Sequence, residues 1–350
     1  MKAPKYKWQP TSVEIAAAAG IRAEDVERFD QNTSPFKTEW AAGVAASVLQ
    51  RVNEYPAATY RSLRDAAASL SGLEPEQIVP GAGADELILL CARAFLNRGD
   101  TAAAATPTYP LYEIATLQVG AVFQQVPASA PDFAYPVDDM VRAARDADMV
   151  WICAPSNPIG TAVADEAVDA VVAATDGLVV IDAAYAEFAG TDWSSRVGRN
   201  HNVIVLRTLS KAFGIAGARV GYAMAHPDLV AAIDGIRPPG SVSAVSVDLG
   251  VAALQRPDRM EETVNKVAAL RAELSSALAG LGLRTLPSLT NFVLCEVGDN
   301  AHVLADKLMG EGLVVRRFPA GGPLENYLRF TVRSSDAHDR LISALERYLP

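Results

Sequence analysis

Two basic residues in the stretch TLSKAFGIAGARVGY are the strongest candidates for chemistry in this chain of 350 residues. Lys211 comes shortly after the apolar run VIVL, and Arg219 lies further on in a Gly-rich segment. Lys211 is either a solvated loop lysine or an amine that forms a Schiff base with a carbonyl compound, as catalytic lysines do. Arg219, together with the hydroxyls of Thr208 and Ser210, could bind a phosphate group.

Further polar residues stand where other apolar runs end. Asp182 ends the run GLVVID, where a carboxylate is costly unless it is paired. It either caps the helix that follows or faces a cationic ring nitrogen. Tyr185 follows in AAYAEF, and Asn157 lies in APSNPIG, where an Asn-Pro pair is also ordinary turn chemistry.

The stretch PGAGADELI is a Gly-rich turn that opens a helix. The free backbone N–H groups at such a helix start, here at Ala84 and Asp85, bind phosphate. The stretch lacks the third glycine of a dinucleotide fingerprint and the GK[ST] of a P-loop. With Tyr109 in TPTYPLY as a stacking aromatic, the candidates supply a phosphate cradle, an acid for a ring nitrogen, two donors for a phenolic oxygen and a lysine amine. Those are the requirements of pyridoxal 5′-phosphate.

The elements that must position these residues form an α/β pattern. The runs MVWIC, LVVID and VIVL lack polar alternation, which predicts strands buried on both faces of a mostly parallel sheet. Ala-rich helical stretches alternate with them, so a ligand is expected beyond the carboxyl ends of the strands. We predict an N-terminal arm over 1–40 that packs with a small domain, a large cofactor-binding domain over 41–245, and a small α+β domain over 246–350.

Composition excludes several classes of function. The chain carries 41 acidic against 31 basic residues, a formal net charge of −10, which argues against nucleic-acid binding. Its three cysteines are far apart and do not form a disulfide framework, and its four histidines show no metal-ligand spacing. No apolar run approaches the ~20 residues of a membrane span, and no signal peptide is visible. We therefore expect a cytoplasmic protein with no metal, membrane or nucleic-acid partner.

The motifs PGAGADEL, TPTYPLY, APSNPIGT, VVIDAAYAEF and TLSKAFGIAGARVGY, in this order, resemble the fold-type I aminotransferases over nearly the whole chain. The segments FDQNTSPF and VVRRF…YLRFTV resemble the histidinol-phosphate aminotransferase branch. The resemblance implies a large domain with a mostly parallel seven-stranded sheet, a smaller α+β domain, pyridoxal 5′-phosphate as cofactor, and a homodimer.

The same resemblance assigns roles to individual residues. Lys211 would form the Schiff base with the cofactor and act as the catalytic residue. The other cofactor contacts would be Asp182 at the pyridine nitrogen, Asn157 and Tyr185 at the phenolic oxygen, Tyr109 on the ring, and, at the phosphate, Ala84, Asp85, Thr208, Ser210, Arg219 and Tyr55 of the neighbouring subunit. Arg329 would bind the substrate α-carboxylate and Arg316 the distal phosphate of histidinol phosphate.

The expected reaction moves an amino group between an amino compound, with L-histidinol phosphate as the first choice, and 2-oxoglutarate, in ping-pong fashion. An aromatic or other amino-acid transaminase, a threonine-phosphate decarboxylase-like enzyme and a non-catalytic binding protein remain alternatives. Departures from the family pattern at Ala183 and Thr33 surround the substrate side chain. Because side chains alternate along a strand, only one of Arg316 and Arg317 can face the cleft, and we choose Arg316. The alternative is that both are solvated surface charges.

Overall fold

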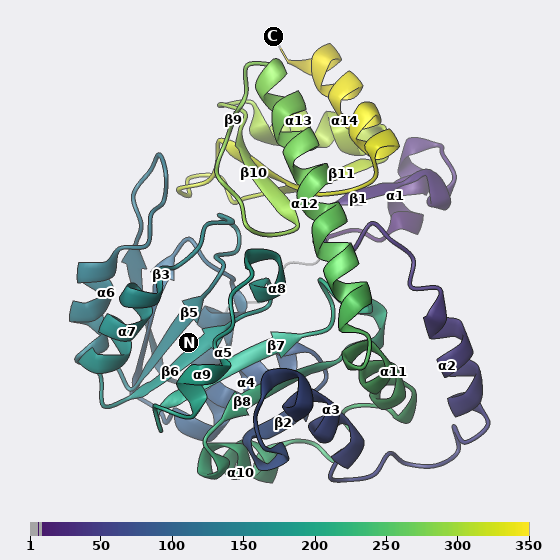
Figure 1. The fold of residues 1–350 in the computed structure, drawn as a ribbon. Helices are drawn as coiled ribbons and strands as arrows, with labels where there is room; N and C mark the ends of the chain where they lie inside the picture. Colours follow the sequence, from purple (N-terminus) through teal and green to yellow (C-terminus); the bar gives the residue numbers. More distant parts are fainter. Residues whose placement is uncertain (1–5, 7–8, 350) are drawn as a thin grey trace.

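The computed structural model describes residues 6 and 9–349, and in this part of the chain two β-sheets carry helices on their faces (Figure 1). The first residues of the predicted arm and the last residue of the predicted small domain lie outside the described residues. The larger sheet has the order β2-β8-β7-β6-β5-β3-β4. Its strands are β2 (Ile78–Gly81), β3 (Thr101–Thr106), β4 (Val122–Pro127), β5 (Met149–Cys153), β6 (Leu178–Asp182), β7 (Val203–Thr208) and β8 (Gly221–Ala225).

The predicted mostly parallel, seven-stranded sheet is confirmed. Only β8 runs antiparallel to its neighbours β2 and β7, and the other pairs are parallel. Val179 and Ile181 pack into one apolar cluster and Val180 into another, so β6 is buried on both faces as its unbroken apolar sequence predicts.

Helices cover both faces of this sheet. Those on one face are α3 (Arg61–Ser71), α6 (Val137–Ala144), α7 (Asp165–Ala174) and α11 (Ala244–Leu254), and those on the other are α4 (Ala84–Phe95), α5 (Leu111–Gln118) and α10 (Pro227–Ile236). Shorter or peripheral elements are α2 (Trp40–Leu49), α8 (Ala186–Ala189), α9 (Ser194–Val197) and the 3₁₀ turns η1 (Ala23–Asp25), η2 (Pro75–Gln77) and η3 (Ala216–Ala218).

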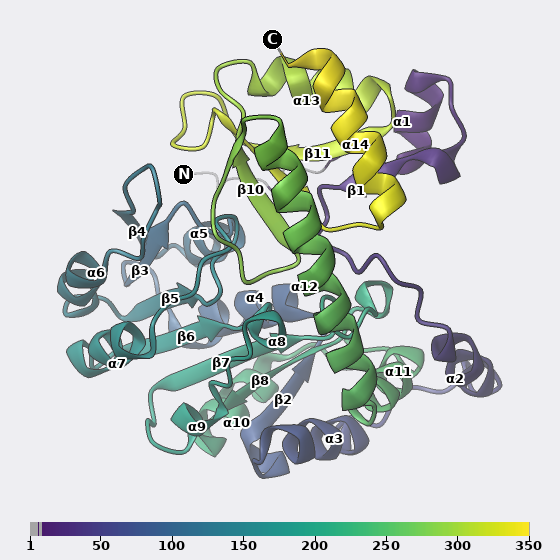
Figure 2. The same cartoon turned by 45° about the horizontal axis from the view of Figure 1, so that its top comes forward.

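The smaller sheet has five strands in the order β1-β11-β12-β10-β9. They are β1 (Glu27–Phe29), β9 (Arg284–Thr285), β10 (Phe292–Glu296), β11 (Leu313–Arg317) and β12 (Tyr327–Thr331). The helices beside it are α1 (Ser12–Ala19), α12 (Pro257–Gly280), α13 (Ala301–Gly310) and α14 (Ser335–Tyr348). Figure 2 shows α12 running from the larger sheet to the smaller one.

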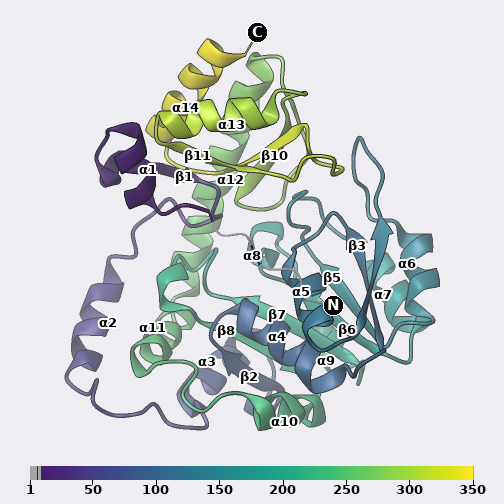
Figure 3. The same ribbon diagram turned by 180° about the vertical axis from the view of Figure 1, so that it is seen from behind.

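The N-terminal segment joins the smaller sheet. β1 pairs in parallel with β11 as the edge strand of that sheet. The view from behind shows α1 next to this edge, while α2 stands at the edge of the larger part (Figure 3). The domain limits at residues 40 and 245 remain a prediction. The second limit would divide α11, which packs against α2 and α3.

None of the helices in the described part of the chain is both long and apolar enough to cross a membrane.

Candidate active site

The carboxyl ends of β5, β6 and β7 bring most of the predicted site residues together. Cys153, at the end of β5, pairs in register with Asp182, which in turn pairs with Leu206. The loops that follow these strands carry Asn157, Tyr185 and Lys211. Lys211 Nζ lies 5.8 Å from the centre of the Tyr185 ring.

Asp182 is a buried carboxylate with both oxygens occupied. Oδ2 accepts a hydrogen bond from Tyr112 Oη at 2.6 Å, and Oδ1 accepts one from the Ala184 backbone N–H at 3.1 Å. Burial raises the pKa of Asp182 to about 6, although the Tyr112 hydroxyl opposes this shift. No cation among the described residues forms an ion pair with this carboxylate, so its charge is available to a cationic group of a ligand.

Tyr112 is a site residue that the sequence analysis missed. It is fully buried, and its ring stacks on Trp151 with centroids 5.3 Å apart. The available signal is its place in TPTYPLY, three positions after Tyr109, which puts both rings on one side of α5 and the turn before it. The two rings meet edge to face at 5.8 Å.

Lys211 is half-buried, and its Nζ donates to the Gln31 carbonyl at 3.4 Å. Desolvation, followed by the positive charge of Arg329, lowers the pKa of Lys211 to about 8. A substantial fraction of the amine is therefore neutral at mildly alkaline pH. The neutral amine is the form that attacks a carbonyl carbon.

The start of α4 forms a cradle that only glycine permits. Gly83, the residue before Ala84, has φ +82°, and a Cβ there would lie 2.7 Å from Arg219 Nη2. Arg219 Nη2 donates to Asp85 Oδ2 at 2.9 Å, and Tyr109 Oη donates to Asp85 Oδ1 at 3.0 Å. Backbone N–H groups at a helix start and a guanidinium thus face the same space, which suits a phosphate.

Hydroxyl groups complete this cradle from the end of β7. Arg219 Nη1 donates to Ser210 Oγ at 3.3 Å, and Thr208 Oγ1 donates to the same oxygen at 3.0 Å. Both hydroxyl residues are buried. The structure therefore groups the predicted phosphate contacts of this chain.

Tyr55 is the exception. It lies between α2 and α3, its side chain is 95% exposed, and it stands outside the cluster.

The smaller sheet contributes two arginines side by side. Leu328 and Phe330 pack beneath the helices of the small sheet, so Arg329 between them points to the opposite face. Arg329 pairs in register with Arg316 across β11 and β12. Arg317, on the other face of β11, forms an ion pair with Asp306 at 2.6 Å.

Arg329 is buried and only partly bonded. Nη1 donates to Asn157 Oδ1 at 2.6 Å, Nη2 donates to the Asp30 carbonyl at 2.8 Å, and the guanidinium lies 4.9 Å from the centre of the Phe292 ring. Nε finds no acceptor within the described chain, and burial lowers the pKa of Arg329 to about 10. In this part of the chain neither Arg329 nor Arg316 pairs with a carboxylate, so both cations are available to an anionic ligand.

Asn32 is a second residue that the sequence analysis missed. Its Nδ2 donates to Tyr185 Oη at 2.8 Å. It lies in FDQNTSPF, which indicated an arm but no role for this side chain. Over residues 6 and 9–349, no three His, Cys, Asp or Glu side chains gather as ligands for a metal ion.

The chain is similar to known proteins over most of its length. The chain is 34% identical over 329 residues to the histidinol-phosphate aminotransferase of Thermoanaerobacter sp. (strain X514), covering 92% of this chain and 93% of the relative. The crystal structure of histidinol-phosphate aminotransferase from Sinorhizobium meliloti in complex with pyridoxal 5′-phosphate superimposes with a TM-score of 0.90 at 28% identity, covering 98% of this chain and 95% of that one.

The fold is shared more widely. L-threonine-O-3-phosphate decarboxylase from Porphyromonas gingivalis has a TM-score of 0.79 at 23% identity, covering 92% of this chain and 98% of that one. The fold alone therefore does not select the reaction. The family model for aminotransferase class I and II matches residues 24–345, and with this match over most of its length the chain belongs to the class I and II aminotransferases.

Proposed function

We propose that this aminotransferase binds pyridoxal 5′-phosphate and transfers the amino group of L-histidinol phosphate to 2-oxoglutarate. The relatives named above support both the cofactor and the donor. The observation that carries the choice of donor is the register pair of Arg316 and Arg329, two neighbouring cations without a carboxylate partner in the described chain.

The residues present fit the cofactor. The Gly83 cradle, which a Cβ would fill, offers backbone N–H groups and Arg219 to a phosphate. The buried carboxylate of Asp182 would pair with a protonated pyridine nitrogen, and Lys211 supplies an amine of lowered pKa for the aldehyde. When bound, this cofactor holds the substrate nitrogen covalently and withdraws electrons from the substrate Cα.

The chain's own residues then control protons and orientation. Lys211 Nζ, once released, takes the proton from the substrate Cα as a general base, a role that its lowered pKa suits. Asp182 holds a proton on the ring nitrogen by charge, and Tyr112 holds Asp182 in place. Tyr109, edge to face with Tyr112, gives the ring of the cofactor an aromatic surface.

Arg316 and Arg329 together could bind both the amino donor, histidinol phosphate, and the acceptor, 2-oxoglutarate. In histidinol phosphate the phosphate ester occupies the branch that carries the carboxylate in an amino acid. The α-carboxylate of 2-oxoglutarate then needs one guanidinium, for which the buried Arg329 is placed, whereas a dianionic phosphate is large enough to engage Arg316 as well.

A donor screen with matched arginine variants tests this proposal. Arg316→Gln should lower kcat/KM for histidinol phosphate by about 10- to 150-fold, the value of one charge-assisted contact, and leave phenylalanine as donor nearly unchanged. Arg317→Gln, whose guanidinium is held by Asp306 on the other face, is the control and should behave as the wild type. Equal losses for both donors would contradict the phosphate assignment and favour an aromatic transaminase, and release of CO₂ from threonine phosphate would favour the decarboxylase.

We also propose that the enzyme works as a homodimer. Tyr55 is 95% exposed, and Leu49 and Val52 at the end of α2 are more than half exposed, at 56% and 64%. A second copy that covers this region would place Tyr55 at the partner's phosphate cradle. Co-expression of Tyr55→Phe with Lys211→Ala should then restore activity, because one of the two mixed sites has both residues intact. Mixed protein no more active than the sum of the two single variants would contradict this arrangement.

A further inference from the structure

Asn32 occupies a position that few residues could fill. It is 2% exposed and has φ +52°, in the left-handed region that asparagine tolerates better than other residues with a Cβ. Its backbone N–H donates to Thr331 Oγ1 at 2.9 Å, and its carbonyl accepts from Asn291 Nδ2 at 2.9 Å. Its Oδ1 lies 3.1 Å from Thr331 Oγ1, and its Nδ2 donates to Tyr185 Oη at 2.8 Å.

The hydrogen bond from Asn32 Nδ2 to Tyr185 Oη determines which role the Tyr185 hydroxyl can take. An amide nitrogen only donates, so Tyr185 Oη is the acceptor and keeps its own proton for another acceptor. The Tyr185 ring is held edge to face by Phe292 at 5.4 Å and lies below Lys211 Nζ. No acceptor for its own proton is found among the described residues, so this O–H can donate to a ligand beside Lys211.

We propose that Asn32 is a positioning residue that directs the Tyr185 hydroxyl proton to the phenolic oxygen of pyridoxal 5′-phosphate. The proposal rests on the cofactor assigned under the proposed function. Donation to this oxygen withdraws negative charge from it and makes the nitrogen of the Lys211–cofactor linkage less basic.

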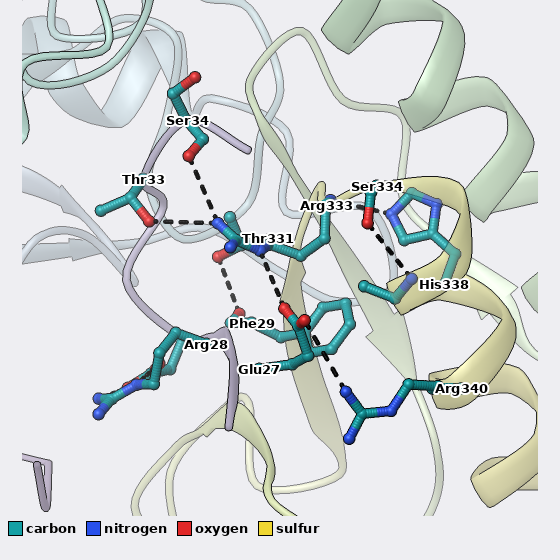
Figure 4. A network of polar contacts seen from close by, with 12 residues as sticks. Glu27, Arg28, Phe29, Thr33, Ser34, Thr331, Arg333, Ser334, His338 and Arg340 are labelled. Carbon is teal, nitrogen blue, oxygen red and sulfur yellow. Dashed lines mark hydrogen bonds and ion pairs between the residues drawn. The ribbon is translucent and has the colours of Figure 1, made fainter. Parts of the chain in front are cut away.

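The smaller sheet fixes Asn32 in place. Thr331, at the end of β12, donates to the Phe29 carbonyl at 2.8 Å (Figure 4). Arg333 donates to Thr33 Oγ1 at 3.5 Å and to the Ser34 carbonyl at 3.4 Å in the same view. The segment on both sides of Asn32 is thus attached to the small sheet, while Tyr185 follows β6 of the large sheet. The Asn32–Tyr185 bond couples the position of the small sheet to the electronics of the cofactor.

Replacement of Asn32 by a residue that only accepts tests this coupling. In Asn32→Asp the carboxylate would take the Tyr185 proton for itself. The visible absorption band of the holoenzyme, titrated with pH without substrate, should then have its midpoint raised by about one pH unit, a tenfold change in proton affinity. Tyr185→Phe should raise it as well. Thr38→Val removes another contact between the same segment and the large part, Thr38 Oγ1 to the Gly214 carbonyl, and should leave the midpoint unchanged.

The double variant separates positioning from simple charge. If Asn32 acts through the Tyr185 proton, Asn32→Asp adds nothing in the Tyr185→Phe background. An equal shift in both backgrounds would show that the new negative charge acts directly and would overturn the proposal. A wild-type midpoint in Asn32→Asp, beside a raised one in Tyr185→Phe, would overturn it too.

Two further measurements complete the test. If Asn32→Asp does not fold, Asn32→Gly, which accepts φ +52° without strain, should raise the midpoint by less than Tyr185→Phe does, and no rise at all would contradict the proposal. A wild-type protein that develops no visible band with pyridoxal 5′-phosphate would instead refute the proposed cofactor, and this inference with it.

Discussion

Tyr112 Oη donates to Asp182 Oδ2 over 2.6 Å, inside a cluster where both side chains are buried. The phenol ring cannot easily move, because it stacks on Trp151, whose Nε1 donates to Thr116 Oγ1 at 3.3 Å. The hydroxyl lowers the pKa of Asp182 against the larger effect of desolvation. Tyr112 therefore helps to keep a carboxylate ionised in a place that disfavours charge.

Tyr112→Phe should weaken this carboxylate as a partner of the ring nitrogen. Loss of the hydrogen bond raises the pKa of Asp182 further above 6, so cofactor affinity should fall at neutral pH by about tenfold and recover as the pH increases. The measurement is the dissociation constant of pyridoxal 5′-phosphate between pH 6 and 9. Thr116→Val removes a buried hydroxyl from the same cluster without contact to Asp182 and should not change the pH profile. A profile for Tyr112→Phe that is parallel to the wild type would contradict this role.

Asp182 should destabilise the protein when no cofactor is bound. Its pKa is raised from 3.8 to about 6 in the fold, so the folded state binds more protons than the unfolded state between these values. Stability conferred by the protonated acid is therefore lost as the pH rises from about 4 to about 6, and the cost is constant above that. We expect Asp182→Asn to stabilise the apoprotein by about 1–3 kcal/mol at pH 7.5 and by less at pH 5.

Chemical denaturation of the apoprotein at the two pH values measures this difference. Addition of pyridoxal 5′-phosphate should reverse the order, because only the wild type offers a carboxylate to the ring nitrogen. A stability difference that does not change with pH would show that Asp182 is ionised in the apoprotein at pH 5 as well.

The phosphate cradle should not tolerate a side chain at Gly83. Ala at this position would have to adopt φ +82° and ψ 172°, a region essentially restricted to glycine that costs about 1–3 kcal/mol, and its Cβ would displace the Arg219 guanidinium 2.7 Å away. Gly72 is a control with positive φ outside the cradle, since it ends α3 with φ +65° and a Cβ there meets nothing within 4 Å. Both variants should lose thermal stability, and only Gly83→Ala should lose cofactor affinity, by about tenfold or more. Equal affinities in the two variants would contradict the cradle.

Much of this architecture follows from local sequence. Unbroken apolar runs predict β5, β6 and β7, and parallel strands bring the polar residues at their carboxyl ends together. The sequence alone therefore predicts that Asp182 and Lys211 lie in the same site. Strand alternation likewise places Arg316 and Arg317 on opposite faces.

The supporting contacts could not be predicted in this way. Tyr112 is 70 positions from Asp182, and Asn32 is 153 positions from Tyr185. Which side chain reaches another across such a separation depends on helix rotation and on how the small sheet sits against the large one. Neither quantity is encoded in periodicity. The local signals are weak: Tyr112 follows Tyr109 by three positions, and asparagine at position 32 is compatible with positive φ.

The last prediction concerns the amine of Lys211. Burial, and then the charge of Arg329, lowers the pKa of this group from 10.5 to about 8. The neutral amine attacks the cofactor aldehyde, so the rate at which the apoprotein forms its visible band should rise about tenfold per pH unit below pH 8 and level off above it. In Arg329→Gln one neighbouring positive charge is gone, which favours the protonated amine and should move the midpoint upward. Arg317→Gln removes a guanidinium that Asp306 holds on the other face of β11, and should leave the midpoint near 8. A wild-type midpoint close to 10.5 would mean that Lys211 behaves as a solvated lysine, and the role of the free amine as the base at the substrate Cα would then have no basis in its environment.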